Sequence, residues 1–397
     1  MPTRPCWVEI CTQAFEENYR FLATLAAPHA ELLAIVKADA YGHSLALCAP
    51  AAGRAGAQWL GVTSVEEGVA ARALCPQAHV LIIGGIFPGQ AADVVRHSLT
   101  TVAWEPWQLD ELATAALLAG AKAGSLPVHL EMDTGMSRQG VDPDQLVPAL
   151  ARFTAESPLR LQGVMTHLFA ADEADGAVTE AQLHRLDAAL SHIEAAGLYA
   201  EWLNVGSSAA LVAGQAGAIA ALANRWGMKA MMRPGLALYG LTPQFDPGFD
   251  ADFAPPPVLA ETRARLQPVL SWKTRVTGVR SIPAGAVVGY NGTFVATEPM
   301  RLALLPAGYA DGLDRRLGNR FSLLVRGQRA PLVGRVSMDQ SVIDVTDIPD
   351  VAAGDEVVIL GTQGDETITA FDHAAAAGTI PWEVFTRIAP RVLRVAV

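Results

Sequence analysis

The sequence predicts an α/β protein in which a (β/α)8 barrel of the TIM type precedes a mostly-β C-terminal domain. From about residue 31 to residue 240, short apolar runs alternate with longer Ala-rich stretches, as expected for parallel strands joined by crossover helices. Beyond residue 258, short alternating segments are bounded by Gly and Pro, which is typical of antiparallel strands. The chain of 397 residues is also longer than one hydrophobic core usually organises.

Eight strand candidates follow one another in the first region. They read LLAIVKA, WLGVT, VLIIG, TTVAW, VHLEMD, LQGVMTH, EWLNVG and KAMMRPGLALYG. The stretches between them are long enough for helices that return the chain to the start of the next parallel strand. Eight strands in this span favour a closed barrel over 12–242, with a doubly wound open sheet as the structural alternative.

A connecting loop is predicted between the two regions. The segment LTPQFDPGFDADFAPPPV (241–258) combines Pro, Asp and Phe without helical or strand periodicity. The strand candidates that follow it read VLSWKTRVTGV, MRLALLPAG, FSLLVRG, APLVGRV, QSVIDVTDI and DEVVILG. They predict a β-rich domain over 243–397.

The composition excludes several classes of protein. Hydrophobic residues make up 51% of the chain and charged residues 17%, a balance that disordered proteins lack. The 40 acidic and 29 basic residues give a net charge of −11, which argues against nucleic acid and anionic membranes as partners. No apolar stretch reaches the length of a membrane-spanning helix, and the acidic N-terminal segment does not resemble a signal peptide. We therefore expect a cytoplasmic protein.

The cysteines indicate neither a metal site nor a disulfide framework. Cys6, Cys11, Cys48 and Cys75 stand at irregular spacings, without a C-x-x-C pair or an accompanying His cluster. We expect free thiols that pack as small hydrophobic side chains, and no bound metal.

Polar residues stand directly after several of the predicted barrel strands. Catalytic groups in a parallel barrel come from the carboxyl ends of the strands, so these residues are expected to gather at one face. The set is Lys37 after LLAIV, Arg138 after HLEMDTGMS, His167 after LQGVMT, Ser207 and Ser208 after EWLNVG, and Arg233 after KAMM. Most of these side chains can hold an anion or move a proton.

Lys37 is the most informative member of this set. It ends an apolar run, where a solvated ammonium group is unfavourable and the amine is therefore easily deprotonated. A neutral amine at the mouth of a barrel is what Schiff-base chemistry with a carbonyl cofactor requires. Taken alone, a lysine at a strand end more often just extends into solvent.

The run AIVKADAYGHS resembles the cofactor-binding signature of the alanine racemase family, whose members are fold-type III pyridoxal-phosphate enzymes. Later segments resemble that family's motifs in order: HLEMDTGMSRQGV, MTHLFAADE, MMRPGLALYGL, VGYNGTF, LPAGYADG, GRVSMDQ and TIPWEV. The resemblance implies an amino-acid racemase that uses pyridoxal phosphate and two bases to interconvert L-alanine and D-alanine, supplying D-alanine for cell-wall peptidoglycan. It also implies that residues 1–11 form a strand of the β domain, and that the protein is a homodimer with shared active sites.

The resemblance implies the catalytic residues as well. Lys37 would bind the cofactor covalently and act as one acid/base, and Tyr290 of VGYNGTF, from the other subunit, would be the opposing base. His167 and, behind it, Arg233 would assist the phenol, because a nearby cation favours the phenolate. Arg233 would face the pyridine nitrogen, where a fixed cation disfavours a protonated ring and so favours proton exchange at the α-carbon over decarboxylation and transamination.

Phosphate binding is expected after the last two barrel strands, where such sites recur in barrels. The implied donors are the Ser208 hydroxyl, the backbone amides of Gly235 and Leu236, and the phenol of Tyr41. Taken alone, GSS and RPG are more typical of ordinary turns.

Three further residues would contact the cofactor or the substrate. Arg138 would reach the phenolic oxygen of the cofactor and the substrate beside it, the Met338 amide of the partner would receive the substrate carboxylate, and Tyr309 would narrow the entrance. Taken alone, Tyr290 fits an amphipathic strand-edge residue and His167 a core histidine.

Four positions depart from the commonest pattern of the family. Glu131 replaces a Lys that becomes carbamylated, Ser207 an Asn, Ser337 a Cys, and Trp382 a Tyr that donates to phosphate. Ser207 and Trp382 are still expected to contact the cofactor, and Trp382 keeps one N–H donor. Glu131 is expected to pair with Arg138 and to supply the anion that the carbamylated Lys presents in relatives.

Three other functions are compatible with parts of this pattern. A broad-specificity amino-acid racemase would share every residue named above. A fold-type III amino-acid decarboxylase is disfavoured by Arg233, and a non-catalytic cofactor-binding barrel is disfavoured by Tyr290 and by the β domain.

Overall fold

The computed structural model describes residues 4–142, 145–173, 176–245 and 257–397. Contacts divide the chain into two compact units, which we call the barrel unit (13–40 and 48–267) and the β unit (1–12, 41–47 and 268–397). Helix α11 (Pro257–Arg265) contacts α9 and belongs to the barrel unit, whereas the sequence placed everything after residue 242 in the β domain. Residues 246–256 of the predicted connecting loop lie outside the described residues.

The predicted barrel is confirmed. Eight parallel strands pair in sequence order, and the pairing of β2 with β9 closes the ring. The strands are β2 (Ala30–Ile35), β3 (Trp59–Val62), β4 (His79–Ile82), β5 (Thr100–Ala103), β6 (Leu126–Glu131), β7 (Leu159–Met165), β8 (Trp202–Ser207) and β9 (Lys229–Arg233). Each of them coincides with one of the apolar runs predicted to be a strand, so all their carboxyl ends lie at one face of the barrel.

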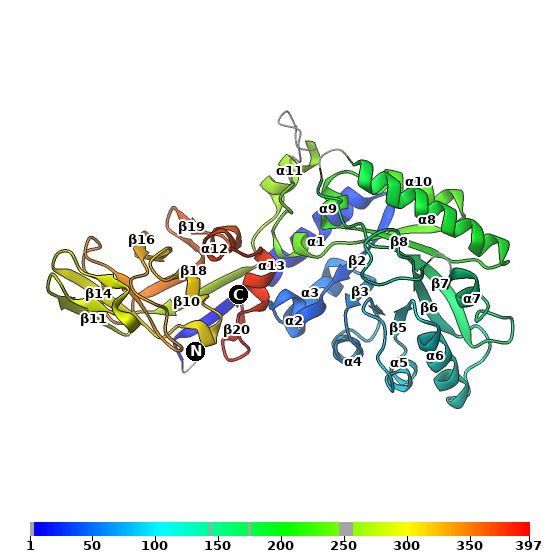
Figure 1. Ribbon diagram of the computed structural model, residues 1–397, viewed down its shortest axis with the longest axis horizontal. Helices are drawn as coiled ribbons and strands as arrows, with labels where there is room; N and C mark the ends of the chain where they lie inside the picture. Colours follow the sequence, from blue (N-terminus) through cyan, green and yellow to red (C-terminus); the bar gives the residue numbers. More distant parts are fainter. Residues whose placement is uncertain (1–3, 143–144, 174–175, 246–256) are drawn as a thin grey trace. The chain divides into compact units, whose positions relative to one another are not determined.

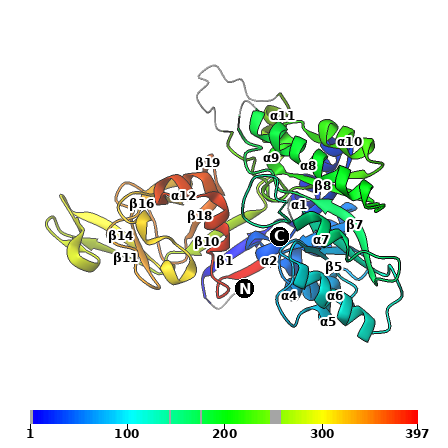
Figure 2. The same ribbon diagram turned by 45° about the vertical axis from the view of Figure 1, so that its right-hand side comes forward.

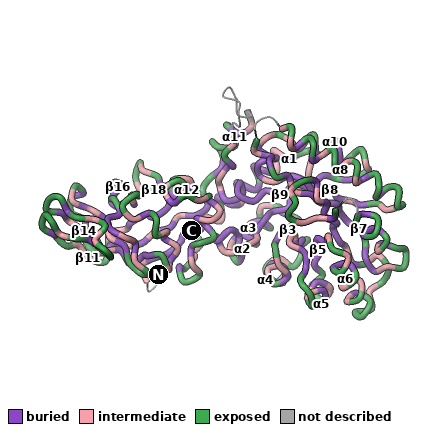
Figure 3. The backbone as a smooth tube through the Cα atoms, viewed as in Figure 1, coloured by how far each residue is buried: buried purple, intermediate pink, exposed green. Residues whose placement is uncertain are grey.

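Helices cover the outer side of the barrel strands, as α4, α5 and α6 show in Figure 1. Besides α11, the helical segments of this part are α1 (Thr12–Ala26), α2 (Lys37–Tyr41), α3 (Leu45–Ala55), α4 (Val65–Leu74), α5 (Ala91–Arg96), α6 (Pro106–Leu118), α7 (Leu146–Leu150), α8 (Ala177–Ala195), α9 (Ser208–Val212), α10 (Ala216–Arg225) and the 3-10 turn η2 (Leu236–Tyr239). Of these, α2 has left-handed backbone angles. The strands between them are buried along almost their whole length (Figure 3). Among the described helices, none combines the length and apolar character needed to cross a bilayer.

The β unit is mostly β structure, as predicted. Its strands are β1 (Cys6–Ile10), β10 (Leu270–Arg275), β11 (Gly278–Ile282), β12 (Val287–Val288), β13 (Phe294–Val295), β14 (Met300–Leu305), β15 (Ser322–Val325), β16 (Gln328–Pro331), β17 (Ser341–Asp344), β18 (Glu356–Gln363), β19 (Glu366–Ile368) and β20 (Leu393–Ala396). Its helices are α12 (Ala370–Ala377) and α13 (Pro381–Thr386), with the 3-10 turns η3 (Tyr290–Gly292), η4 (Tyr309–Asp311) and η5 (Arg315–Leu317).

Strand β1 joins the two ends of the chain in one sheet. It pairs antiparallel with β10 and parallel with β20 (Figures 1 and 2). Cys6, Val8 and Ile10 of this strand are buried, so the first described segment contributes to the core of the β unit rather than to the barrel.

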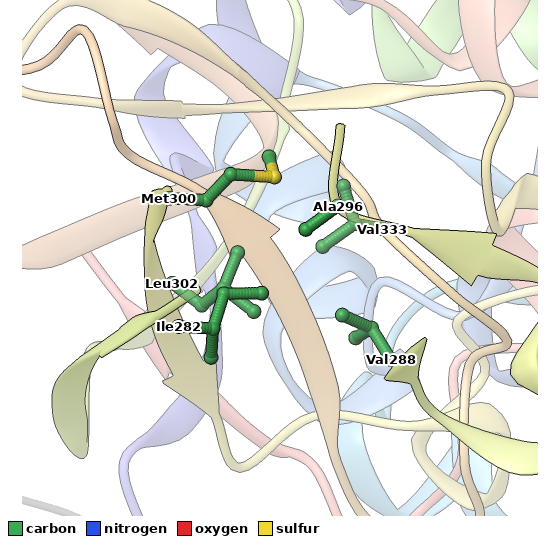
Figure 4. Close-up of a cluster of buried hydrophobic side chains, with 6 residues drawn as sticks. All are labelled: Ile282, Val288, Ala296, Met300, Leu302 and Val333. Carbon is green, nitrogen blue, oxygen red and sulfur yellow. The ribbon is translucent and has the colours of Figure 1, made fainter. Parts of the chain in front are cut away.

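A separate apolar cluster supports the part of the β unit that carries Tyr290. Its buried members are Ile282, Val288, Ala296, Met300, Leu302 and Val333 (Figure 4). Val288 ends β12 and Phe294, which packs against the cluster, begins β13. The short turn η3 between these two strands is therefore anchored on both sides by apolar packing.

We expect the barrel to lose stability in acid, because His129 of β6 is fully buried. Its ring lies beside Trp59 and in the space left by the missing side chain of Gly163. Burial, and then the charge of Arg233, lower the pKa of His129 to about 3. An unfolded histidine binds its proton near pH 6.5, so the unfolded chain holds more protons between these values. The free energy of unfolding then falls by about 1.4 kcal/mol per pH unit as the pH drops.

Calorimetry of His129→Phe between pH 7 and pH 4.5 checks this expectation, with the exposed His184 changed to Phe as the control. The His129 variant should show a shallower loss of melting temperature with falling pH than the wild type and the control. Equal slopes in all three proteins would contradict it.

Candidate active site

Lys37 leaves the carboxyl end of β2 into a left-handed turn. The residues after it, Ala38, Asp39 and Ala40, have φ of 52–54° and ψ of 48–52°, and Tyr41 continues with φ 54°. Each such non-glycine residue costs about 1–2 kcal/mol relative to a right-handed turn. The contacts around this turn must therefore stabilise it, and one of them is the bond from the Ala40 amide to the Val36 carbonyl (2.9 Å).

Arg233 ends β9 and is buried, with its guanidinium group held by neutral acceptors. Nη1 donates to the backbone and side-chain oxygens of Asn204 (2.6 Å each), and Nη2 donates to the Thr166 carbonyl (2.7 Å). Nη2 also lies 3.2 Å from Nδ1 of His167. Burial lowers the pKa of Arg233 to about 10, so the group still carries its positive charge at neutral pH.

His167 follows β7 and is neutral in this setting. Burial, and then the charges of Arg233, Arg138 and Lys37, lower its pKa to about 3. A guanidinium group can only donate, so Nδ1 accepts from Arg233 and the ring proton resides on Nε2. The backbone of His167 is fixed as well, because the side-chain amide of Gln182 in α8 donates to the His167 carbonyl (3.0 Å).

The amine of Lys37 shares this cationic setting. Lys37 is half-buried, and burial, then Arg138 and Arg233, lower its pKa, while Glu67 acts in the opposite direction. The structure thus places Lys37, Arg138, His167 and Arg233 within electrostatic reach of one another, as the sequence predicts. A lowered pKa increases the fraction of neutral, nucleophilic amine.

The predicted phosphate-binding segments meet after β8 and β9. The buried Ser208 hydroxyl begins α9 and accepts the amides of Gly235 (2.9 Å) and Ala237 (3.2 Å). Leu236 follows Gly235 and opens η2, and the half-buried Ser207 ends β8. The structure therefore brings these residues together, and it connects Ser208 to the Gly235 amide directly.

The predicted ion pair between Glu131 and Arg138 is not formed. Glu131 is 2% exposed, and its Oε2 accepts from Nε2 of Gln139 (2.6 Å), while Arg138 is exposed. Arg138 and Gln139 are adjacent in the sequence, but it is the Gln139 side chain that bonds to Glu131. The same Gln139 amide group also donates to the Ile83 carbonyl. Burial raises the pKa of Glu131, and the bond from Gln139, then Arg233 and Arg138, act in the opposite direction.

We expect Glu131→Gln to lower activity by about 5- to 30-fold, the equivalent of 1–2 kcal/mol. The amide oxygen can still accept from Gln139, so the change removes chiefly the negative charge that offsets Arg138 and Arg233. Glu131→Lys should be impaired and should regain activity with bicarbonate, which converts the amine into a carbamate anion. Kinetics with and without bicarbonate check this, and wild-type activity should not respond. An unimpaired Glu131→Gln protein would return Glu131 to a purely structural role.

The remaining predicted residues belong to the β unit, and several of them are exposed. Tyr290 in η3 is 68% exposed, Tyr309 in η4 is 43% exposed and Met338 is 54% exposed. Tyr41, at the end of the left-handed turn, is buried, which raises its pKa to about 12. Trp382 is half-buried in α13.

The loops that carry Tyr309 and Met338 are fixed to each other. The Tyr309 amide donates to the Ser337 carbonyl (3.0 Å), and the Ala310 amide donates to the Met338 carbonyl (2.9 Å). Gly308 permits this approach, because a Cβ there would lie 2.4 Å from the carbonyl oxygens of Ser337 and Met338. These bonds therefore fix the two loops that carry the proposed substrate contacts relative to each other.

Sequence reasoning missed the residues that hold the others in place. Asn204 and Thr166 carry the Arg233 guanidinium, and Glu67 contacts the turn after Lys37. Asn204 could have been noticed as a polar residue inside the apolar run EWLNVG, because buried polar groups need partners. Glu67 gave a weaker signal. Its spacing of three residues from Ser64 predicts the start of a helix, but it does not indicate that the side chain contacts another loop.

A barrel with a lysine among guanidinium groups at its strand ends, together with a β unit that carries an exposed tyrosine, has the features expected of a pyridoxal-phosphate-dependent enzyme of the racemase class. Residues 10–243 match the alanine racemase N-terminal domain, and residues 269–396 match the alanine racemase C-terminal domain. The chain belongs to the alanine racemase family.

Individual relatives agree along the whole chain. An alanine racemase of Symbiobacterium thermophilum is 40% identical over 98% of this chain and 97% of its own length. The crystal structure of alanine racemase from Streptomyces lavendulae superposes with a TM-score of 0.88 at 32% identity, covering 100% of this chain and 98% of that one. Alanine racemase from Bartonella henselae, solved with covalently bound pyridoxal phosphate, has a TM-score of 0.82 at 26% identity and covers 100% of both chains.

Proposed function

We propose that this enzyme interconverts L-alanine and D-alanine with pyridoxal phosphate held at the mouth of the barrel, and that it supplies D-alanine for cell-wall peptidoglycan. The observation that carries the proposal is the half-buried Lys37 at the end of β2, whose pKa is lowered by burial and by two guanidinium groups. Such an amine can attack the carbonyl carbon of a cofactor and can exchange a proton near neutral pH.

The residues around Lys37 fit an anionic, phosphorylated cofactor. Arg138 and Arg233 place two guanidinium charges near Lys37. These fixed cations can attract the phosphate or phenolate oxygens of a bound cofactor. The proposed contacts are Lys37, Tyr41, Arg138, His167, Ser207, Ser208, Arg233, Gly235, Leu236 and Trp382.

When bound, pyridoxal phosphate withdraws electrons from the α-carbon of the amino acid and so makes its hydrogen acidic. Arg233, which we place at the pyridine nitrogen, remains a cation because its pKa stays at about 10. Its direct contacts, carbonyl oxygens and a neutral ring, do not neutralise that charge. A fixed cation disfavours a second positive charge beside it. This arrangement favours racemisation over decarboxylation.

Two bases on opposite faces would move the α-proton. We assign Lys37 to the proton of D-alanine and Tyr290 of a partner subunit to that of L-alanine. The neutral His167 keeps its Nε2–H as a donor for the phenolate oxygen, while Arg233 holds Nδ1. Arg138 and the Met338 amide would position the substrate, and Tyr309 would restrict its size.

A homodimer with shared sites accounts for the exposure of the catalytic phenol. Val287, Tyr290 and Val295, on β12, η3 and β13, are 60%, 68% and 51% exposed, and such apolar exposure is typical of a surface that another chain covers. We place the enzyme in the cytoplasm, which is supported by four free thiols.

Substrate class can be tested directly with a panel of L-amino acids, recording loss of optical activity and release of carbon dioxide. We expect rapid racemisation of alanine and no carbon dioxide. Comparable rates for many amino acids would favour the broad-specificity racemase, and carbon dioxide release would favour the decarboxylase. Bound cofactor without either reaction would indicate a binding protein.

A further inference from the structure

We propose that Glu67 is a positioning residue for Lys37: its carboxylate holds the left-handed turn through which the lysine leaves strand β2. Glu67 lies in the first turn of α4. Its Oε1 accepts the amides of Ala38 (2.6 Å) and Asp39 (3.4 Å), and its Oε2 accepts the amide of Thr63 (2.9 Å). One side chain therefore connects the turn after Lys37 to the end of the neighbouring strand, β3.

The turn needs such a partner because its conformation is unfavourable for the residues that form it. Ala38, Asp39 and Ala40 are left-handed without being glycine, and conformations of this kind persist only where surrounding contacts fix them. Glu67 supplies a charged acceptor for two amides of this turn, those of Ala38 and Asp39. Hydrogen bonds to charged groups are stronger than neutral ones.

Both carboxylate oxygens are used, so the chemistry of the side chain matters as much as its shape. In Glu67→Gln one of the two positions becomes an NH2 group, which would face an amide donor instead of accepting from it. The turn would then relax, and the Lys37 amine would shift from its position at the carboxyl end of β2. Misplacement of a reacting group costs rate more than binding.

Glu66 provides a matched control. It occupies the same first turn of α4, but its carboxylate bonds to a different residue: Oε1 accepts from Nε2 of Gln90 (3.0 Å). Glu66→Gln therefore makes the same chemical change in the same helical turn without touching the residues after Lys37.

The first measurement is amide hydrogen exchange of peptides spanning 36–42 in the cofactor-free proteins. Amide exchange reports local opening of the backbone, and Glu67→Gln weakens the bonds that hold the Ala38 and Asp39 amides. We therefore expect exchange at these two amides to be at least about tenfold faster in Glu67→Gln than in Glu66→Gln or the wild type. Equal exchange in all three proteins would overturn the proposal. This result does not depend on the reaction catalysed, so the proposed function can fail while the role of Glu67 stands.

The second measurement separates positioning from general stability, and it rests on the proposed function. We expect Glu67→Gln to keep the absorbance of the lysine-bound cofactor and to melt close to Glu66→Gln, while kcat per loaded site falls about 10- to 100-fold and KM changes little. A variant that loses cofactor or melting temperature but keeps its kcat per loaded site would show a merely structural role. Glu67→Asp, one methylene shorter, should recover less than half of the lost kcat, because it cannot reach both amide groups at once.

Discussion

Lys37→Ala should lower racemisation by about 10,000-fold or more, because it removes both the covalent attachment of the cofactor and one of the two bases. The absorbance of the lysine-bound cofactor should disappear in the same variant. Absorbance spectra of the purified protein with added pyridoxal phosphate, together with polarimetry on L-alanine and D-alanine, check both effects. The turn after Lys37 is held by bonds from its backbone amides to Glu67 and to the Val36 carbonyl. None of these bonds uses the Lys37 amine, so the fold should survive its loss.

The exposed Lys122 offers a control for the loss of a positive charge. Lys122→Ala should retain the spectrum and the activity of the wild type. A fully active Lys37→Ala protein would end the assignment of the site, whatever the behaviour of the control.

Tyr290→Phe should reduce racemisation by about 100- to 10,000-fold, the usual contribution of a general acid or base, while leaving the cofactor bound. Exchange of the α-hydrogen of D-alanine in deuterated water should remain measurable, because Lys37 serves that face. The same exchange from L-alanine should be lost. Equal loss of exchange from both isomers, with the cofactor in place, would contradict the division of labour between the two residues.

Mixing the two inactive variants tests whether Tyr290 acts on a partner subunit. A heterodimer of Lys37→Ala and Tyr290→Phe chains contains one site with both native residues, so activity should return to a fraction of the wild-type value. Restored activity would support shared sites in a homodimer. If the subunits exchange and activity stays absent, both bases belong to one chain.

The barrel could be predicted from the sequence because its parallel strands are buried on both faces and therefore read as unbroken apolar runs. Short or half-exposed strands of the β unit gave no comparable signal. β12 has two residues, and β20 includes Arg394 at the edge of its sheet. The boundary of 242/243 between functional domains stays a prediction.

The local geometry of the site could be predicted only in part. The sequence identified the residues at the strand ends, and the structure gathers three of them, Arg138, His167 and Arg233, around Lys37. The run KADAY is rich in residues that favour right-handed helices, so its left-handed turn could not be foreseen. Adjacent residues such as Arg138 and Gln139 cannot be assigned to one partner without knowing which way each side chain leaves the loop, and here Gln139 reaches Glu131.

The position of β1 between β10 and β20 sets the order in which a newly made chain can fold. The ribosome releases Cys6–Ile10 well before their pairing partners, which are Leu270–Arg275 and Leu393–Ala396. At about 5–20 residues per second, this apolar strand waits roughly 15–50 s for its first partner, a time in which residues 13–267 can already form the barrel unit. Among the described strands of this sheet, the edge strand β20 arrives last. The sheet is therefore completed only once Leu393–Ala396 have been released, and until then one edge of β1 stays open to other unfinished chains.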